Sequence, residues 1–280
     1  MKQASRCLHA GLAFALVICV CSPARAQFTP QPLSVPAHGE SFHIEFGAGL
    51  WSPGTDIVVS SAGTGALSGL VGTEIDAQRD LGFADQRLPT IQLVVRAAKA
   101  HKFRFDYVPI SYSADTTVHQ TIVFNGQRYQ VGLPLTSTLD WKAYRFGYEY
   151  DFIQRARGFG GFILQVKYTD ARVELDATGP QTISEFDEVR VPIPAIGGIA
   201  RFYVVPNIAL TADVTAFKLP TVSGRYAGHY VDVDAYATVN FTNYFGVQGG
   251  YRSLNMGYLV KQDTGSFVLS GIYLGVVARY

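Results

Sequence analysis

Hydrophobic and polar residues alternate with a period of two along most of the chain beyond residue 41. In residues 139–152 one register is aromatic over five successive positions: Tyr144, Phe146, Tyr148, Tyr150 and Phe152. The other register carries polar or small residues: Arg145, Gly147, Glu149 and Asp151. Successive side chains of a β-strand point to opposite faces, so this stretch predicts a strand with one apolar and one polar face.

About ten segments show the same alternation. They are residues 42–51, 91–98, 102–107, 139–152, 162–168, 196–204, 208–214, 230–241, 245–252 and 266–280. In the first, Phe42 and Ile44 fall on the apolar face, and His43 and Glu45 on the other. A chain of such strands satisfies its backbone in lipid by closing a barrel. We predict an all-β fold, a transmembrane antiparallel up-and-down β-barrel of about ten strands, with eight or twelve as alternatives.

The connections between these segments differ in length and predict the orientation of the barrel. Four are short, at residues 99–101, 154–158, 205–207 and 242–244. Five are long, at residues 53–88, 113–138, 176–189, 220–229 and 257–265. Short turns are typical of the periplasmic side and long loops of the exterior. Within 113–138, Asn125-Gly126 predicts a hairpin turn, and the loop at 53–88 either extends strands or folds inward.

The amino terminus has the pattern of an export signal. Lys2 and Arg6 precede an apolar run, and Ala24 and Ala26 are small residues suited to cleavage before Gln27. We therefore divide the chain into a signal peptide at 1–26, a periplasmic lead at 27–41 and a barrel domain at 42–280. All three cysteines lie in the signal peptide, so the remaining chain has no disulfide.

The last segment, residues 266–280, alternates up to an aromatic final residue and resembles the closing strand of bacterial outer-membrane barrels. The resemblance is to the class of the OmpA transmembrane domain and the OmpW-like barrels, at the level of pattern. It implies an assembly signal formed by Leu274, Val276, Ala278 and Tyr280. It also implies a location in the bacterial outer membrane and contacts with outer-membrane lipids, lipopolysaccharide, periplasmic chaperones and the barrel assembly machinery.

The polar registers would place many charges inside the barrel. The expected lumen charges are Glu45, Arg96, Arg104, Asp106, Arg145, Glu149, Asp151, Lys167, Arg201, Asp213, Asp232, Asp234, Arg252 and Arg279. Charges removed from bulk water must be paired, and a barrel of this size is just wide enough for side chains to fill it or to hold one small ligand. We therefore expect a structural or surface-interacting barrel with a side-chain-filled lumen, and keep a narrow channel for small solutes as the alternative.

Catalysis is the third interpretation, as an outer-membrane protease or lipid-modifying enzyme. The nearest candidate groups are His229 with Asp232 and Asp234, and His119 with Asp115 and Asp140, but no motif surrounds them. In the first long loop, Asp76, Asp80 and Asp85 lack the spacing of a calcium loop. We expect no enzyme activity, no metal and no cofactor. Without the three basic residues of 1–26 the chain carries a net charge of −2, so no nucleic-acid partner is expected.

Overall fold

The computed structural model describes residues 37–60, 72–124, 127–178 and 183–280. Within these ranges no helix is long and apolar enough to cross a membrane. The predicted signal peptide and most of the predicted lead lie outside the described residues, so the division of the chain before residue 37 stays a prediction.

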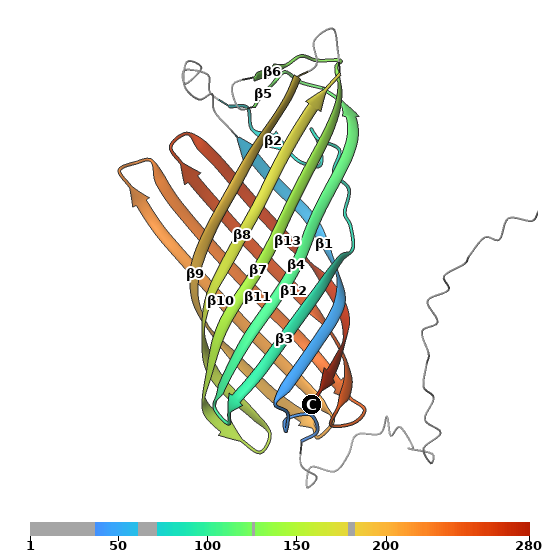
Figure 1. Cartoon of the computed structure of the whole chain (residues 1–280), viewed down its shortest axis with the longest axis vertical. Helices are drawn as coiled ribbons and strands as arrows, with labels where there is room; N and C mark the ends of the chain where they lie inside the picture. Colours follow the sequence, from blue (N-terminus) through green and yellow to red (C-terminus); the bar gives the residue numbers. More distant parts are fainter. Residues whose placement is uncertain (1–36, 61–71, 125–126, 179–182) are drawn as a thin grey trace, which may run out of the picture.

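Ten strands form a closed antiparallel barrel (Figure 1). They are β1 (Ile44–Ser60), β3 (Leu88–Ala98), β4 (His101–Thr117), β7 (Pro134–Arg155), β8 (Gly158–Ala177), β9 (Ile183–Val205), β10 (Ile208–Val222), β11 (Tyr226–Asn240), β12 (Phe245–Val260) and β13 (Asp263–Arg279). Each pairs with the next along the chain, and β13 closes the barrel on β1, from Glu45↔Arg279 to Ser60↔Thr264. The predicted fold and the predicted strand number are confirmed.

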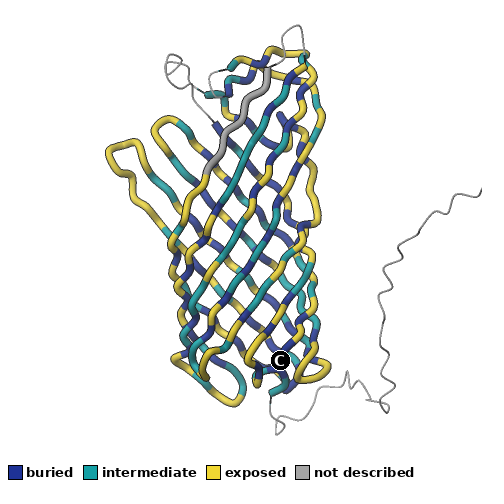
Figure 2. The backbone as a smooth tube through the Cα atoms, in the orientation of Figure 1, coloured by how far each residue is buried: buried dark blue, intermediate teal, exposed yellow. Residues whose placement is uncertain are grey.

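The four short turns lie at one end of the barrel, which we call the turn end, and the opposite end is the loop end. Near the turn end the walls alternate between more exposed and more buried residues (Figure 2). On β7, for example, Phe146 and Phe152 are exposed whereas Glu149 and Asp151 are buried. The exposed apolar side chains form a belt around the turn-end half, as a lipid-facing surface requires.

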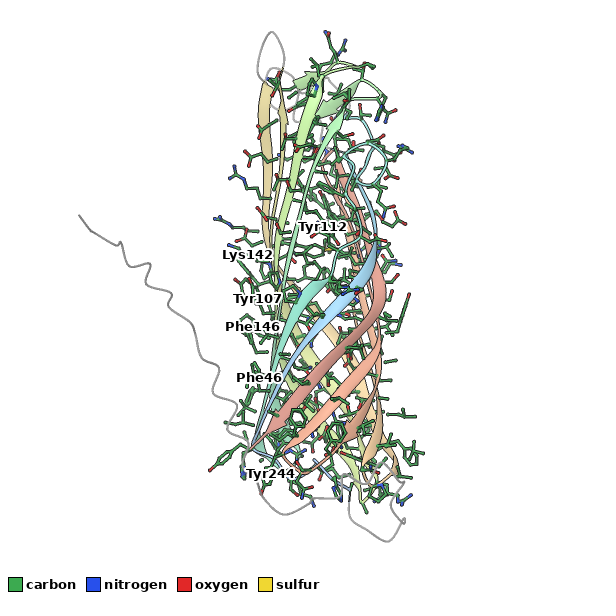
Figure 3. All side chains as sticks on the ribbon, turned by 90° about the vertical axis from the view of Figure 1, so that its right-hand side faces the viewer. Phe46, Tyr107, Tyr112, Lys142, Phe146 and Tyr244 are labelled. Carbon is green, nitrogen blue, oxygen red and sulfur yellow. The ribbon has the colours of Figure 1, made fainter. Side chains whose placement is uncertain are left out.

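Aromatic side chains mark the upper edge of this apolar belt. Tyr144 stacks on Tyr107 with ring centroids 4.8 Å apart, and Phe146 packs against Phe105 at 5.0 Å. Figure 3 shows Lys142 on the loop-end side of Tyr107 and Phe146, and Tyr244 at the turn end. The belt therefore ends at Tyr144 on β7, where outward side chains change from aromatic to charged.

Three expected long loops are instead largely strand. The connection after β8 is confined to residues 178–182, that between β10 and β11 to 223–225, and that between β12 and β13 to 261–262. Residues 113–117 and 134–138 also belong to strands. The prediction of long loops was wrong at these places because it equated the end of the apolar register with the end of the strand. Residues 53–60 extend β1, which is one of the two alternatives predicted for the first long loop. The strands continue beyond the belt, where outward side chains are polar.

The remaining long connections pack at the loop end. Residues 72–87, including β2 (Ile75–Asp76), lie between β1 and β4, where β3 no longer separates them. Thr55 and Asp85 are joined by a hydrogen bond, and Phe83 stacks on Tyr112 at 5.7 Å. In the second connection, β5 (Ile122–Phe124) and β6 (Gln127–Tyr129) pair as predicted around residues 125–126, which lie outside the described part.

The first strand begins two residues later than predicted. Phe42 is buried at the turn-end mouth with the Arg96 guanidinium 4.3 Å above its ring, whereas His43 is exposed. Regular strand structure begins only at Ile44, so the alternation does not extend back to these two residues.

Candidate functional site

The middle of the lumen contains a carboxylate shared by three cations. Asp232 on β11 accepts hydrogen bonds from Arg145 at 2.9 Å, Lys167 at 2.9 Å and Arg252 at 3.0 Å, and all four side chains are shielded from solvent. These residues come from β7, β8, β11 and β12. The cluster therefore links opposite walls of the barrel across its axis.

A second cluster lies nearer the turn end. Glu149 on β7 accepts hydrogen bonds from Lys102 and Arg104, each at 2.7 Å, and Lys102 also contacts Asp151 at 2.8 Å. The Lys102 ammonium lies 3.5 Å above the Phe159 ring, which adds a cation–π contact. Each of these buried charges has an opposite charge beside it, as burial requires.

The described end of the lead, residues 37–41, contacts the turn-end mouth. Glu40 accepts hydrogen bonds from Arg201 at 2.9 Å and Tyr203 at 2.8 Å, and its backbone oxygen accepts one from Arg96. Burial opposes ionisation of the Glu40 carboxyl, but the charge of Arg201 and the hydrogen bonds from Arg201 and Tyr203 outweigh it. The pKa of Glu40 therefore lies below its usual value.

The structure points every expected lumen charge inward and gives each an ionic or hydrogen-bond partner. Besides the contacts above, Glu45 binds Arg279, Asp106 lies 3.7 Å from Arg145, Asp213 lies 3.9 Å from Arg104, and Asp234 accepts a hydrogen bond from Tyr273. Whether this network is needed for function stays a prediction.

Two members of the network are absent from the expected set. Lys102 occupies the same inward register of β4 as Arg104 and Asp106, so the alternation pattern could have identified it. Glu40 lies before the first strand, in a proline-containing stretch without periodicity, and no sequence signal identifies it.

Above the belt the two faces of the wall exchange character. On β7, Leu139 and Trp141 are buried inside the barrel, whereas Asp140 and Lys142 are exposed outside. The buried apolar side chains of this half form one continuous cluster. It includes Trp51, Tyr112, Tyr129, Leu175, Phe267 and Leu269. The lumen thus has a charged tier toward the turn end and an apolar tier toward the loop end.

The apolar tier contains a cavity of about 560 Å³, which we call the upper cavity. Its walls are mainly apolar and come from most of the barrel strands, and Phe124 of β5 also lines it. Trp141 and Phe267 meet edge to face in its wall with ring centroids 5.6 Å apart. The Trp141 Nε1 atom is buried and has no hydrogen-bond partner within the described chain. A mainly apolar cavity of this size is typical of small-molecule sites.

The groups considered for catalysis do not assemble. His229 is exposed and bonds Asn255 at 3.0 Å, whereas Asp232 lies on the opposite face of β11 inside the barrel. Asp115 and Asp140 are both exposed and bond Thr136 and Ser111, respectively. Neither candidate group of histidine and aspartate residues therefore forms an acid–base pair.

The acidic residues of the first long connection form hydrogen bonds with nearby groups of the protein. Asp76 and Asp80 bond backbone or side-chain groups of their own segment, and Asp85 bonds Thr55. The described residues contain no group of three or more side chains arranged to hold a metal ion. In the proposed assembly signal, Leu274, Val276, Ala278 and Tyr280 all face outward, and their role in assembly stays a prediction.

Comparisons with known proteins show the fold and nothing narrower. No protein-family model matches the sequence, and no curated protein is significantly similar to it. Among solved structures, the outer membrane protease OmpT from Escherichia coli superposes with a TM-score of 0.52 at 9% identity, covering 89% of this chain and 100% of that one.

Two further structures are more distant. The outer membrane protein AlkL gives a TM-score of 0.36 at 13% identity, covering 90% of this chain and 95% of its own. The toluene transporter TodX of Pseudomonas putida gives 0.34 at 9% identity, with 85% and 90% covered. At these identities the likeness concerns architecture alone, and the chain has the β-barrel fold of outer-membrane proteins.

Proposed function

We propose that this protein is an outer-membrane barrel that binds a small apolar molecule in the upper cavity. The observation that carries the proposal is the position of an apolar cavity of about 560 Å³ directly above a tier of paired charges. Burial of apolar surface in such a cavity is favourable at about 25 cal/mol per Å². The loop end faces the exterior in this proposal, so the cavity faces the source of the ligand.

The charged tier argues against an open aqueous pore through the whole barrel. The Asp232 cluster crosses the lumen, Arg104 of the Glu149 cluster reaches toward Asp213 on β10, and Glu40 and Phe42 lie at the turn-end mouth. The expected side-chain-filled lumen therefore describes the turn-end half. The expected narrow channel for small solutes becomes, in this proposal, an apolar binding site that occupies the loop-end half.

Tryptophan fluorescence gives a direct test. The chain has two tryptophans, and Trp141 lines the cavity whereas Trp51 does not. In a Trp51→Phe protein held in phosphatidylcholine nanodiscs, bromobenzene should quench Trp141 saturably through its heavy atom. Quenching that rises linearly with bromobenzene concentration, as it does for free tryptophan added to the same nanodiscs, would refute binding in the cavity.

A matched pair of substitutions separates the cavity from the surface. Ala171 lines the cavity from β8, and Arg172, the next residue, faces outward. Ala171→Phe fills part of the cavity and should abolish saturable quenching, and Arg172→Phe should leave it unchanged. Correct folding of each variant is checked by its heat-modifiable mobility.

A further inference from the structure

Two neighbouring strands of the barrel separate beside the upper cavity. Pairing between β9 and β10 runs from Val205↔Ile208 to Ile196↔Ala216 and ends there. Both strands continue: β9 stays paired with β8 to Ile183↔Ala177, and β10 with β11 to Val222↔Tyr226. In Figure 1 the tip of the β10–β11 hairpin leans away from β9. We call the unpaired stretch beyond Ile196 and Ala216 the seam.

The sequence explains why the seam stays unpaired. Pro192 and Pro194 lie in β9 just beyond the last pair, and Pro220 lies in β10. Proline cannot donate a backbone hydrogen bond, so within sheets it is confined to edges, first residues and bulges. The stretches of β9 and β10 that border the seam, which we call its lips, therefore both carry residues typical of a free edge.

The other wide gap in the barrel wall is covered. Between β1 and β4 the segment 72–87 bridges the opening and buries Ile75, Leu81 and Phe83. No strand within the described ranges pairs with β9 or β10 in place of the lost partner. Within the described residues the seam is therefore a lateral opening between two adjacent strands of the wall.

The upper cavity reaches this opening. Val191 and Ile193 line the cavity from β9, and Phe217 and Leu219 line it from β10. Val191 and Leu219 lie in the inward registers but are 39% and 41% exposed, whereas Thr215, inward on the paired part of β10, is 1% exposed. The inward side chains at the lips are accessible because the neighbouring strand is absent.

The seam starts within the apolar belt and runs past its upper edge. Ile196 and Val214 are outward and exposed at its start. Ile196 pairs with Leu164 of the belt, and Pro192 pairs with Tyr168 at the belt edge. Lipid chains would therefore meet the seam from the side. An apolar chain could pass from lipid into the cavity without crossing water.

The lips of the seam also carry cations. Arg190 of β9 lines the cavity mouth and Lys218 of β10 is exposed on the outer face. Arg190 contacts Asp170 at 3.4 Å in an exposed pair, and Asp263 lines the cavity from β13. Exposed pairs of this kind contribute little to stability.

We infer that the upper cavity takes the acyl chain of an anionic amphiphile through the seam, while the head group stays outside at Arg190 and Lys218. The inference rests on the proposed function and adds its ligand class and its route of access. A carboxylate or phosphate head group would find two cations at the level where head groups lie.

The test again uses Trp141 as the reporter in the Trp51→Phe protein in phosphatidylcholine nanodiscs. Terminally brominated dodecanoate and the corresponding neutral alcohol should both quench Trp141, because the bromine lies at the end of the chain. The acid should bind about tenfold more tightly than the alcohol, which is a difference in binding free energy of about 1.4 kcal/mol. Equal affinities would overturn the head-group assignment.

Substitution of the lip cation should remove that difference. Arg190→Gln should weaken binding of the acid about tenfold and leave the alcohol unchanged. Arg172→Gln is the matched control, since Arg172 lies outside the cavity on neighbouring β8 and pairs with Glu174. A loss of equal size in both variants would indicate a general surface charge effect and would overturn the role of Arg190.

Closing the seam tests the route. The predicted mature chain has no cysteine, so Pro194→Cys with Lys218→Cys can be bridged by a bifunctional thiol reagent. The bridge should slow quenching by the neutral alcohol at least about tenfold. The control bridge joins Ala200→Cys and Ala212→Cys, which are already paired lower on the same strands, and should have no effect.

The outcomes separate the two proposals. If bromobenzene does not quench Trp141 saturably, the proposed function fails. If bromobenzene quenches Trp141 saturably but the bridge leaves the rate of quenching by the alcohol unchanged, apolar molecules reach the cavity by another route. In that case only the present inference fails. Heat-modifiable mobility of every variant confirms that a loss of quenching does not come from unfolding.

Discussion

Lys167 of β8 donates a hydrogen bond to Asp232 of β11 across the lumen, over a distance of 2.9 Å. These two strands are not neighbours in the wall. The contact therefore depends on closure of the barrel, and with Arg145 and Arg252 it makes Asp232 the centre of the charged tier.

Loss of the Asp232 charge should strongly destabilise the barrel. Asp232→Asn leaves three buried cations without their shared anion, and removal of one partner from a buried ion pair costs about 3–5 kcal/mol. Urea unfolding in detergent, followed by heat-modifiable mobility, measures the change. Asp140→Asn, at an exposed outward position, should change stability by less than about 0.5 kcal/mol. Equal effects would mean that the cluster does not stabilise the barrel.

The outer face should reject charge within the apolar belt. Leu164 on β8 is 47% exposed in the belt, and Val131 is 61% exposed in the connection after β6. Leu164→Arg should cost about 2–4 kcal/mol if it lies near the middle of the bilayer, and Val131→Arg should be neutral. Unfolding from lipid vesicles compares the two, and similar tolerance would contradict the assignment of the belt as lipid-facing.

Docking of the lead should depend on pH through Glu40. The folded-state pKa of Glu40 is depressed, so its contribution to stability is present above the unfolded value of about 4.3. It is lost as the pH falls through the lower, folded-state pKa. Acidification should therefore release the lead to added protease in the native protein, and Glu40→Gln should be cleaved equally at all pH values. Cleavage of the native lead that did not change with pH would refute this contact.

The charged tier should prevent ion flow. In planar bilayers the native protein should produce no stepwise conductance, because the Asp232 cluster crosses the lumen and Glu40 is held at its turn-end mouth by Arg201. Discrete openings at neutral pH would show that the tier is a conduit and would favour the solute-channel alternative over an apolar site.

The sequence predicts the wall better than it predicts the contents of the lumen. Alternation alone places Phe146 outside and Glu149 inside, because β-strand geometry makes it so. It also contains a less obvious signal: apolar residues occupy the outward register up to Tyr144 on β7 and the inward register at Trp141. That exchange marks where the strand leaves the belt, and a prediction that equates every apolar register with the lipid side does not detect it.

Contacts across the lumen were beyond sequence reasoning. The pairing of Lys167 with Asp232 depends on barrel diameter and on the stagger of every strand, which no local pattern encodes. The upper cavity depends likewise on the parting of β9 from β10 at Ile196 and Ala216. The prolines Pro192 and Pro194 of β9 and Pro220 of β10 are the local signal for that edge.

A crystal structure of the protein soaked with bromobenzene, with bromine located by its anomalous scattering, tests binding in the upper cavity most directly. We predict a peak inside the barrel among Trp141, Met256 and Phe267, which line the upper cavity. Bromine found only on the outer surface, with the interior position empty at saturating ligand, would contradict it.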